Sequence, residues 1–378
     1  MSLKSESNAI IARIGLKGQP VELGKNSQIL HDLSTSGKER PWHKHKVSSL
    51  RLSESYQRLG FMSKAVRVKE CGGYLRFGEC EHGHGTKLKE AKFCQVRLCP
   101  MCSWRKSQVI FTQLNRITHV ASSRQKLSFL FLTLTVRNVG PDQLASELDK
   151  LFHAWNKLMK RREVKPVIVG WFRGLEVTHD VNEYITPWMY ENKKRRGYYK
   201  KLGLKIGDLN PSYDTYHPHF HILLAVHSSF FSGQKYISQQ RWVELWKESL
   251  GVDYAPIVHI QKVKPKREGQ TVEGAVAEIG KYTVKGEDYL TDDLEQTDLA
   301  VSVFDSALAN RRLIAYGGIL REIRKELKLA DVEEADLIHV DDEDETKHHK
   351  CSVCGSDLME VVYTWNFGLK NYVKKDSK

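Results

Sequence analysis

The chain has 378 residues, 40% of them hydrophobic, which is enough for one large domain or two of ordinary size. Its formal net charge is +13, and residues 331–346 hold nine acids and no Lys or Arg, so the rest of the chain carries +22. This charge indicates a polyanionic partner, either nucleic acid or an anionic membrane surface. The sequence has no apolar run of about 18 residues, and its start does not resemble a signal peptide, so we expect a cytoplasmic protein without a membrane span.

The N-terminal residues 1–65 are predicted to form a variable basic region. Residues 1–45 mix Gly, Ser, Lys and His with little periodicity, which is typical of a mobile basic arm. Apolar residues recur at helical spacing between residues 47 and 68, so we expect a short amphipathic helix after the arm.

Five of the seven cysteines lie between residues 71 and 102, which favours metal binding over disulfides in a chain without a secretion signal. Cys99 and Cys102 form a C-x2-C knuckle, a spacing that lets two thiolates bind one tetrahedral ion. The other ligands would come from upstream side chains, with two histidines as spares: Cys71, Cys80 and Cys94, then His82 and His84. We therefore predict a small zinc-binding module over residues 66–120.

Two strands and a helix follow this module. Residues 127–136 are rich in aromatic and apolar residues and predict a strand, after which Pro141 starts a helix with an apolar stripe. Residues 167–178 predict a second strand. A long excursion, residues 181–216, then separates it from the third strand.

Basic and aromatic side chains gather in that excursion, where residues 193–201 read KKRRGYYKK. Cations that follow a backbone and rings that offer stacking faces can grip single-stranded nucleic acid. The candidate DNA-binding residues are Lys193, Lys194, Arg195, Arg196, Tyr198 and Tyr199. The alternative is a hairpin whose charges are only solvated.

Three histidines alternate at the start of the third strand, residues 217–226. Because side chains alternate along a strand, His217, His219 and His221 point to the same face. Two imidazoles at this spacing can bind one divalent cation, and we predict His219 and His221 as the ligands. If the second strand pairs antiparallel with this one, Glu176 can lie beside both histidines.

The elements that follow complete an α+β pattern. Ser238 caps a helix that closes at Leu250, and residues 255–263 predict a further strand. Helices are predicted over residues 271–285 and 306–329. The order of strands and helices favours an antiparallel sheet with helices on one side.

The last residues, 331–378, predict an acidic tail with a second knuckle. The acidic run 331–346 is expected to be disordered or solvated. Cys351 and Cys354 repeat the C-x2-C spacing, but the other half of a metal site is missing. Its ligands could be His348, His349, Cys80 or groups from another chain.

Glu278, Tyr282 and Lys285 are spaced by four and three residues and would share one face of the predicted helix 271–285. Phosphodiester transfer needs an in-line nucleophile, a cation on the non-bridging oxygens and a stabilised leaving oxygen. A free tyrosine has a pKa near ~10, so it attacks well only where cations stabilise its phenolate. Beside a metal strand, Tyr282 is therefore the predicted nucleophile.

Pairs of histidines around one hydrophobic residue resemble the motif of the HUH endonucleases, which cleave single-stranded DNA through a tyrosine. Four further segments occur in the order known from the rolling-circle replication initiators of small Gram-positive plasmids: residues 97–105 (RLCPMCSWR), 131–135 (FLTLT), 175–178 (LEVT) and 278–285 (EIGKYTVK). This resemblance covers roughly residues 65–330. It implies the HUH endonuclease fold over residues 121–330, preceded by the zinc-binding module.

The resemblance also assigns roles to individual residues. It implies Glu176 as the third metal ligand, with His217 as the alternative, and Mn²⁺ or Mg²⁺ as the ion. It favours Cys71 with Cys94, Cys99 and Cys102 for the structural zinc, with Cys80 as the rival of Cys71. Tyr282 would become joined to the DNA 5′ end and release a 3′-OH primer, while Lys285 would contact the phosphate or help to position the metal.

The position of Glu278 implies a termination step. In initiators of this type an acid takes the place of a second tyrosine and activates water, so the second cut is hydrolytic and the strand is religated. Tyr289 is the alternative, as a second tyrosine.

The expected partners are plasmid origin DNA, single-stranded at the nick site, and the host helicase and replication machinery; the oligomeric state stays open. Two rival functions are an HUH-type transposase or mobilisation relaxase, and a zinc-finger DNA-binding regulator without catalysis. The acid at residue 278 and the position of the zinc module before the catalytic core favour the initiator.

Overall fold

The computed structural model describes residues 28–34, 37–263, 276, 284–340, 350–351 and 353–375. The predicted helix 271–285, with Glu278 and Tyr282, therefore lies outside the described residues except for Val276, Val284 and Lys285. Val276 is helical and fully buried. No helix in the described part of the chain is both long and apolar enough to span a membrane.

The centre of the fold is a five-stranded antiparallel sheet with the strand order β6-β3-β5-β4-β7. Its strands are β3 (Leu127–Thr135), β4 (Ile168–His179), β5 (Tyr216–His227), β6 (Val258–Lys262) and β7 (Ile314–Gly317). In β5 every residue from Ile222 to Val226 is fully buried, as expected for a strand that is covered on both faces. The predicted α+β class with an antiparallel sheet is confirmed.

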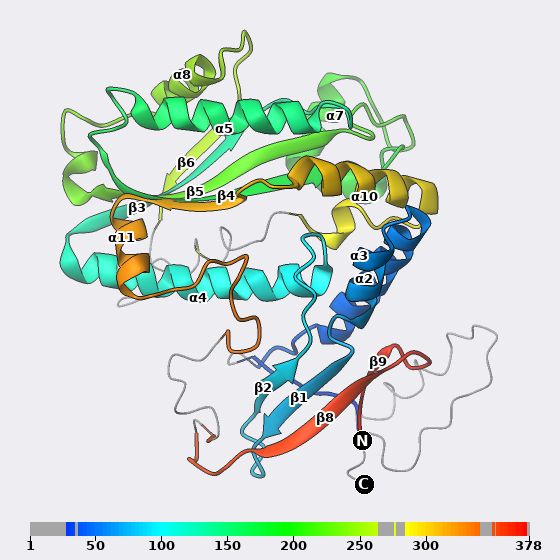
Figure 1. Ribbon diagram of the computed structural model, residues 1–378. Helices are drawn as coiled ribbons and strands as arrows, with labels where there is room; N and C mark the ends of the chain where they lie inside the picture. Colours follow the sequence, from blue (N-terminus) through cyan, green and yellow to red (C-terminus); the bar gives the residue numbers. More distant parts are fainter. Residues whose placement is uncertain are drawn as a thin grey trace, which may run out of the picture.

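Helices cover both faces of this sheet (Figure 1), whereas the order of elements predicted helices on one face only. Helices α5 (Leu144–Lys160) and α8 (Gln239–Leu250) lie on one face, and α4 (Pro100–Arg124) and α11 (Gly318–Glu326) lie on the other. Phe220 of β5 packs against Phe152 and Trp155 of α5, with ring centroids 5.4 and 6.2 Å apart. Its strand neighbours His219 and His221 therefore point away from α5.

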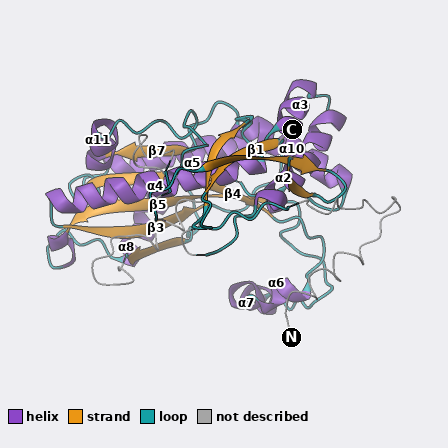
Figure 2. Ribbon diagram, turned by 90° about the horizontal axis from the view of Figure 1, so that it is seen from below, coloured by secondary structure: helices purple, strands orange, loops and turns teal. Residues whose placement is uncertain are grey.

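The excursion between β4 and β5 forms a small helical unit rather than a hairpin. It contains α6 (Pro187–Glu191) and α7 (Lys193–Lys201), which stand apart from the main body (Figure 2). Ile185, Met189 and Tyr199 form a separate small core inside this unit. Short 3₁₀ helices also occur at Ser228–Phe231 (η1) and Gly286–Asp288 (η2).

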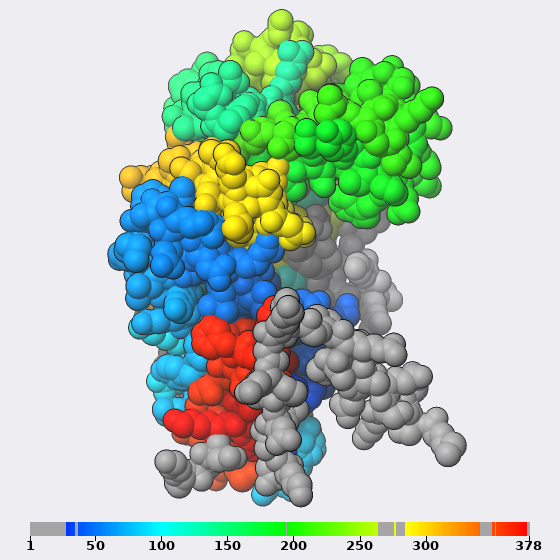
Figure 3. Space-filling view, turned by 90° about the vertical axis from the view of Figure 1, so that its right-hand side faces the viewer, coloured from blue at the N-terminus to red at the C-terminus, as the bar shows by residue number. Residues whose placement is uncertain are grey.

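A second, four-stranded sheet joins the two ends of the chain, in the order β2-β1-β8-β9. Its strands are β1 (Tyr74–Glu79), β2 (Thr86–Ala91), β8 (Met359–Asn366) and β9 (Asn371–Lys374). Figure 3 shows these C-terminal strands, in red, next to the N-terminal helices in blue. The module around the predicted zinc site is therefore completed by strands from the end of the chain.

The N-terminal region contains two helices where the sequence predicted one. They are α2 (Trp42–Arg58) and α3 (Met62–Glu70), separated by Gly60 at a φ of +79°, a conformation that glycine adopts without strain. The α2 helix is joined to α10 (Leu294–Leu308): Arg58 pairs with Asp298 at 2.7 Å. Together the two helices connect the small sheet to the central domain.

Two expectations for the C-terminal third are wrong. The predicted helix 306–329 is instead the end of α10, strand β7 and helix α11. The first part of the acidic run is not a solvated tail, because Val332, Leu337 and Val340 are buried in the main core. Arg105 holds this segment by donating to the Leu337 and Ile338 carbonyls; residues 341–349 lie outside the described residues.

Candidate metal centre and DNA-binding surface

The pairing of β4 with β5 brings Glu176 to the histidines. The two strands are antiparallel and their register sets Glu176 opposite His219, which is the arrangement that the sequence required. On the other side of β5, Thr133 of β3 lies opposite His221. Glu176 and His219 are buried, and His221 is partly exposed.

The three side chains converge on one point. Glu176 Oε2 lies 2.9 Å from His221 Nε2 and 3.6 Å from His219 Nε2. Two ligands at right angles, each 2.0–2.1 Å from an octahedral ion, are about 2.9 Å apart. The donor set and its spacing thus fit a small divalent cation, with positions left for water or phosphate oxygens.

Hydrogen bonds at the far side of each ring orient the histidines. His219 Nδ1 lies 3.0 Å from the His217 carbonyl oxygen, to which it must donate. With Nδ1 bound to this carbonyl, Nε2 is the ring nitrogen that faces Glu176. His221 Nδ1 lies 3.2 Å from the Thr133 hydroxyl, and its ring stacks on Phe131 at a centroid distance of 5.4 Å. Both imidazoles are therefore held in place before any ion binds.

Lys285 is the charged neighbour of this group. Its Nζ lies 3.0 Å from Glu176 Oε1. Burial alone would raise the pKa of Glu176, but hydrogen bonds with His219 and His221 and the charge of Lys285 lower it well below its usual range. Burial in turn lowers the pKa of Lys285, and the Glu176 carboxylate outweighs this and raises it. Glu176 is thus ionised, and Lys285 is charged, across the physiological pH range.

His217, the alternative third ligand, stays outside the group of Glu176, His219 and His221. Its ring stacks on that of His219 at a centroid distance of 5.1 Å. Burial, followed by the neighbouring His219, lowers the pKa of His217 to about 4. Its carbonyl oxygen rather than its ring supports the site.

Tyr289 does not suit the role of a second nucleophile. It is fully buried, and its hydroxyl donates to the Leu98 carbonyl oxygen. Burial, together with the nearby Cys99 and Asp288, raises the pKa of Tyr289 well above its usual value. Its environment is that of a core residue.

Four buried cysteines form the predicted cluster of Cys71, Cys94, Cys99 and Cys102. Sγ of Cys102 lies 3.6 Å from that of Cys71 and 3.7 Å from that of Cys94. Thiolates around tetrahedral zinc, with bonds near 2.3 Å, are about 3.8 Å apart, so the cluster is compatible with structural zinc. Cys80, the rival of Cys71, is not part of this cluster.

One support of this cluster could not be predicted from the sequence. The buried Lys46, on α2, donates to the carbonyl oxygens of Lys69 and Cys71 at 2.7 Å each. Burial lowers the pKa of Lys46, while the nearby cysteines oppose that shift. Its charge compensates part of the negative charge that four thiolates would carry.

The segment between β4 and β5, residues 181–216, carries exposed aromatic rings next to its cations. Only one of the two predicted tyrosines, Tyr198 and Tyr199, is among these exposed rings. Tyr198 is 47% exposed and available for stacking, whereas Tyr199 is 2% exposed and packs in the small core, so Tyr199 has no free face for a base. Trp188, which the sequence reasoning missed, is 68% exposed, and the Arg195 guanidinium lies 5.9 Å from its ring centroid. Arg195 also pairs with Asp180 at 3.3 Å. Lys193, Lys194 and Arg196 lie on α7 together with Arg195, Tyr198 and Tyr199, whereas Trp188 lies on α6.

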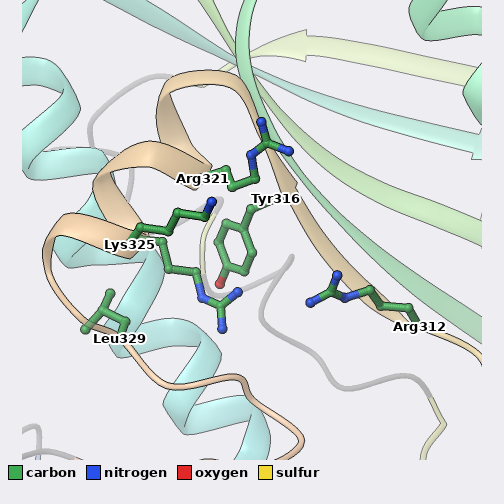
Figure 4. Close-up of a pocket in the computed structure, with 6 residues that line it drawn as sticks. Arg312, Tyr316, Arg321, Lys325 and Leu329 are labelled. Atoms are coloured by element: carbon green, nitrogen blue, oxygen red, sulfur yellow. The ribbon is translucent and has the colours of Figure 1, made fainter.

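A basic cavity of about 450 Å³ lies at the edge strand β7 and helix α11 (Figure 4). It is lined by Arg312, Tyr316, Arg321, Arg324, Lys325 and Leu329. Asp331 neutralises only part of this charge, since it pairs with Arg312 at 3.0 Å and Arg324 at 3.6 Å. Among the described residues, the buried Tyr316 hydroxyl and Arg324 Nε have no hydrogen-bond partner. The lining of the cavity therefore carries a surplus of positive charge, which suits an anion.

The protein is thus of the α+β class, and its central sheet carries two histidines and one carboxylate that could hold a metal ion, with the Lys285 ammonium beside them. The replication protein family matches residues 85–373, and the chain belongs to that family. The resemblance to the replication initiators of small Gram-positive plasmids, which the motifs indicated, is confirmed.

Named relatives agree with this assignment. The chain is 36% identical to a "Protein rep" from Bacillus amyloliquefaciens, over 92% of this chain and 97% of the relative. It is 37% identical to a "Protein rep" from Lactiplantibacillus plantarum, over 92% and 99%. A "Replication protein" from Staphylococcus aureus is 30% identical over 69% of this chain and 96% of the relative. No solved structure gives a significant match.

Proposed function

We propose that the protein initiates rolling-circle plasmid replication by nicking one strand of the origin. The observation that carries this proposal is the convergence of Glu176, His219 and His221, with Lys285 beside them, in a member of the replication protein family. A protein that only bound DNA would have no use for an ionised, buried carboxylate facing two oriented imidazoles.

In this proposal His219, His221 and Glu176 hold one Mn²⁺ or Mg²⁺. The ion would polarise the scissile phosphate and stabilise its developing charge. The oriented Nε2 atoms and the carboxylate supply three ligands without rearrangement. Lys285, whose Nζ already lies at the edge of this group, would move from Glu176 to a phosphate oxygen.

Tyr282 is the proposed nucleophile. It precedes Lys285 by three residues, and three residues of extended chain span at most about 11 Å, so the chain length alone keeps it near the metal centre. Its phenolic oxygen would attack phosphorus and form a phosphotyrosine ester at the DNA 5′ end, while the bond to the 3′ oxygen breaks. The proton lost by the phenol leaves with the 3′-OH, and that hydroxyl primes synthesis.

Glu278 is proposed to act at the end of the cycle. As a general base it would take a proton from water, and the resulting hydroxide would attack the phosphodiester at the second cut. The 3′-OH freed by this cut would then attack the Tyr282 ester, which religates the strand and releases the phenol. Transfer to a second tyrosine would instead leave a covalent link on the protein. The buried environment of Tyr289 supports this choice, because that tyrosine offers no second nucleophile.

Two basic surfaces are proposed to hold the origin strand. The helical unit of α6 and α7 would bind single-stranded DNA through its lysines and arginines, with Trp188 and Tyr198 as stacking faces. The cavity between β7 and α11 would take a backbone phosphate, with Arg321 and Lys325 at its exposed rim. Both contacts would be independent of base sequence.

Cleavage of a single-stranded oligonucleotide from a candidate origin, with Mn²⁺ present, tests the proposal. We expect a covalent protein–DNA adduct that maps to Tyr282 and is lost in EDTA. Tyr282→Phe should abolish the adduct, whereas Tyr289→Phe, the matched control, should keep it. An adduct that persists in Tyr282→Phe would remove the assigned nucleophile, and no cleavage by the wild type on any origin strand would favour the non-catalytic regulator.

A further inference from the structure

A second cluster of metal-ligand side chains lies at the opposite end of the β1–β2 hairpin from the four cysteines. Cys80 follows β1 directly, and His84 lies in the turn before β2. Cys351 and Cys354 come from the segment before β8. One ligand atom from each of these four residues lies within 4.8 Å of all the others.

The spacings within this cluster match those of bound zinc. Cys80 Sγ lies 3.5 Å from Cys354 Sγ and 3.6 Å from His84 Nδ1, and Cys351 Sγ lies 3.8 Å from His84 Nδ1. Bond lengths near 2.3 Å to sulfur and 2.0–2.1 Å to nitrogen place tetrahedral ligands about 3.6–3.8 Å apart. A disulfide would need sulfurs about 2.05 Å apart, and all four groups are free thiols or imidazole.

Both loops are built to present these ligands. The backbone N–H of Gly355 donates to the Cys351 carbonyl at 2.9 Å, and Gly355 has a φ of +75° that closes this knuckle. The Val353 N–H points at Cys351 Sγ at 3.4 Å, a contact that stabilises a thiolate. On the hairpin side, Gly83 donates to the Cys80 carbonyl at 2.9 Å and turns the chain so that His84 faces the sulfurs.

We propose that Cys80, His84, Cys351 and Cys354 form a second structural zinc site. It takes Zn²⁺ because three thiolates and one imidazole are the ligands of closed, tetrahedral zinc centres. In this proposal Cys80 and His84 complete the Cys351/Cys354 knuckle. Cys80 was among its predicted ligands, whereas the sequence indicated His84 only as a spare ligand of the first cluster.

The role of this site follows from its place in the sheet. Strand β8 pairs with β1, and the pair Glu79–Met359 is the first after the cluster. A zinc ion there fixes the register of the C-terminal strand against the N-terminal hairpin, two segments that are about 280 residues apart. The two zinc ions together would hold both ends of β1 and β2.

The two sites should differ in how readily they lose metal. All four cysteines of the first cluster are buried, whereas His84 and Cys354 in the second are exposed. A chelator reaches the second site without opening the core. Moderate chelation should therefore remove one zinc and free β8 and β9 before the first cluster is affected.

Metal analysis of the purified full-length protein tests this proposal. We expect about two zinc ions per chain in the wild type, and the loss of one in Cys354→Ser, a change at an exposed position. His82→Gln is the matched control, because His82 is also exposed and its Nδ1 lies 3.9 Å from Cys354 Sγ, but it is outside the cluster. It should keep both ions.

A second readout covers the ligand set. Replacement of zinc by Co²⁺ should give thiolate charge-transfer bands of a three-sulfur, one-nitrogen site, and His84→Ala or Cys354→Ser should remove them while the bands of the four-sulfur site remain. One zinc per wild-type chain, an unchanged zinc content in Cys354→Ser, or a Cys80–Cys354 disulfide found by mass spectrometry under reducing purification would each overturn the proposal.

Discussion

Glu176 and Lys285 are in contact, yet their replacement should change metal affinity in opposite directions. In the absence of a divalent ion, the Lys285 ammonium is the cation that compensates the Glu176 carboxylate, at 3.0 Å. The ammonium contacts Oε1, whereas the histidines face Oε2, so a metal ion bound at Oε2 would share the charge of the carboxylate with the ammonium. Lys285 therefore competes with the ion, while Glu176 binds it.

The contacts of Glu176 and Lys285 allow the change in Mn²⁺ affinity to be estimated for each variant. Glu176→Gln keeps the volume of the buried side chain but removes its charge and leaves the Lys285 ammonium unbalanced beside two imidazoles. Loss of groups that merely support ligands costs 10–100-fold in affinity, so loss of this ligand should weaken Mn²⁺ binding by more than about 100-fold, or ~2.7 kcal/mol. The pair with Lys285, whose side chain is 39% exposed, is worth on the order of 1–2 kcal/mol after solvent screening. Lys285→Ala should thus tighten Mn²⁺ binding by about 5–30-fold.

Calorimetric titration of the zinc-loaded, DNA-free protein with Mn²⁺ measures the Mn²⁺ affinity of both variants. Nicking should fall in both variants, because Glu176 is the proposed metal ligand and Lys285 the proposed phosphate contact. Arg195→Ala is the control: it breaks a comparable ion pair, with Asp180 at 3.3 Å, away from the metal group and should leave Mn²⁺ affinity unchanged. If Lys285→Ala weakened Mn²⁺ binding as Glu176→Gln does, the lysine would be holding the carboxylate in position, and the competition argument would be refuted.

Four further outcomes follow from the structure. Cys99→Ser should release roughly one zinc and lower the midpoint of thermal unfolding, because structural zinc contributes directly to folding; unchanged zinc by metal analysis would contradict this. Trp188→Ala should weaken single-stranded DNA binding by about 1–3 kcal/mol in fluorescence titrations, and an unchanged affinity would show that its exposed ring is not a stacking face. Burial raises the pKa of Asp288 to about 6, so its contribution to stability is present below about pH 4 and is lost as pH rises through about 6. Asp288→Asn should therefore be more stable than wild type at pH 7–8 by up to ~2–3 kcal/mol in denaturant titrations, with the difference vanishing near pH 4. Glu278→Ala should still nick and form the adduct, but its hydrolytic step should slow by about 10²–10⁴-fold, giving replication products longer than unit length; complete loss of the first nick would instead assign Glu278 to the metal or to nucleophile activation.

The metal centre could be predicted from the sequence because its geometry comes from short-range rules. Alternation along one strand sets His219 and His221 on one face, and antiparallel pairing of two neighbouring strands brings Glu176 to them. The supports of the site have no such signal. The Thr133 hydroxyl reaches it from β3, and nothing in its local sequence shows its direction. Lys285 was expected at the site, but its contact with the Glu176 carboxylate was not.

The prediction of a disordered or solvated run over residues 331–346 is wrong for its first part, because a high density of charge does not prevent spaced apolar residues from being buried. Nine acids dominate the composition of residues 331–346, yet Val332, Leu337 and Val340 within it fill the core. The acids help to hold this segment: Lys106, buried on α4, pairs with Glu333 at 2.6 Å.

The second knuckle shows why a long-range contact escapes sequence reasoning even when its motif is visible. A C-x2-C spacing states that two ligands are close, but the other two depend on which strand the segment joins. Pairing of β8 with β1 rather than with the central sheet is decided by burial of Tyr363 and Trp365 in the small module, and no periodicity within either strand encodes that choice. Once the pairing is known, the ligands follow at once, since the turn that ends β1 must lie beside the segment that begins β8, and this turn carries Cys80 and His84. The zinc proposal is thus a consequence of sheet topology, and it stands or falls with metal content rather than with the nicking reaction.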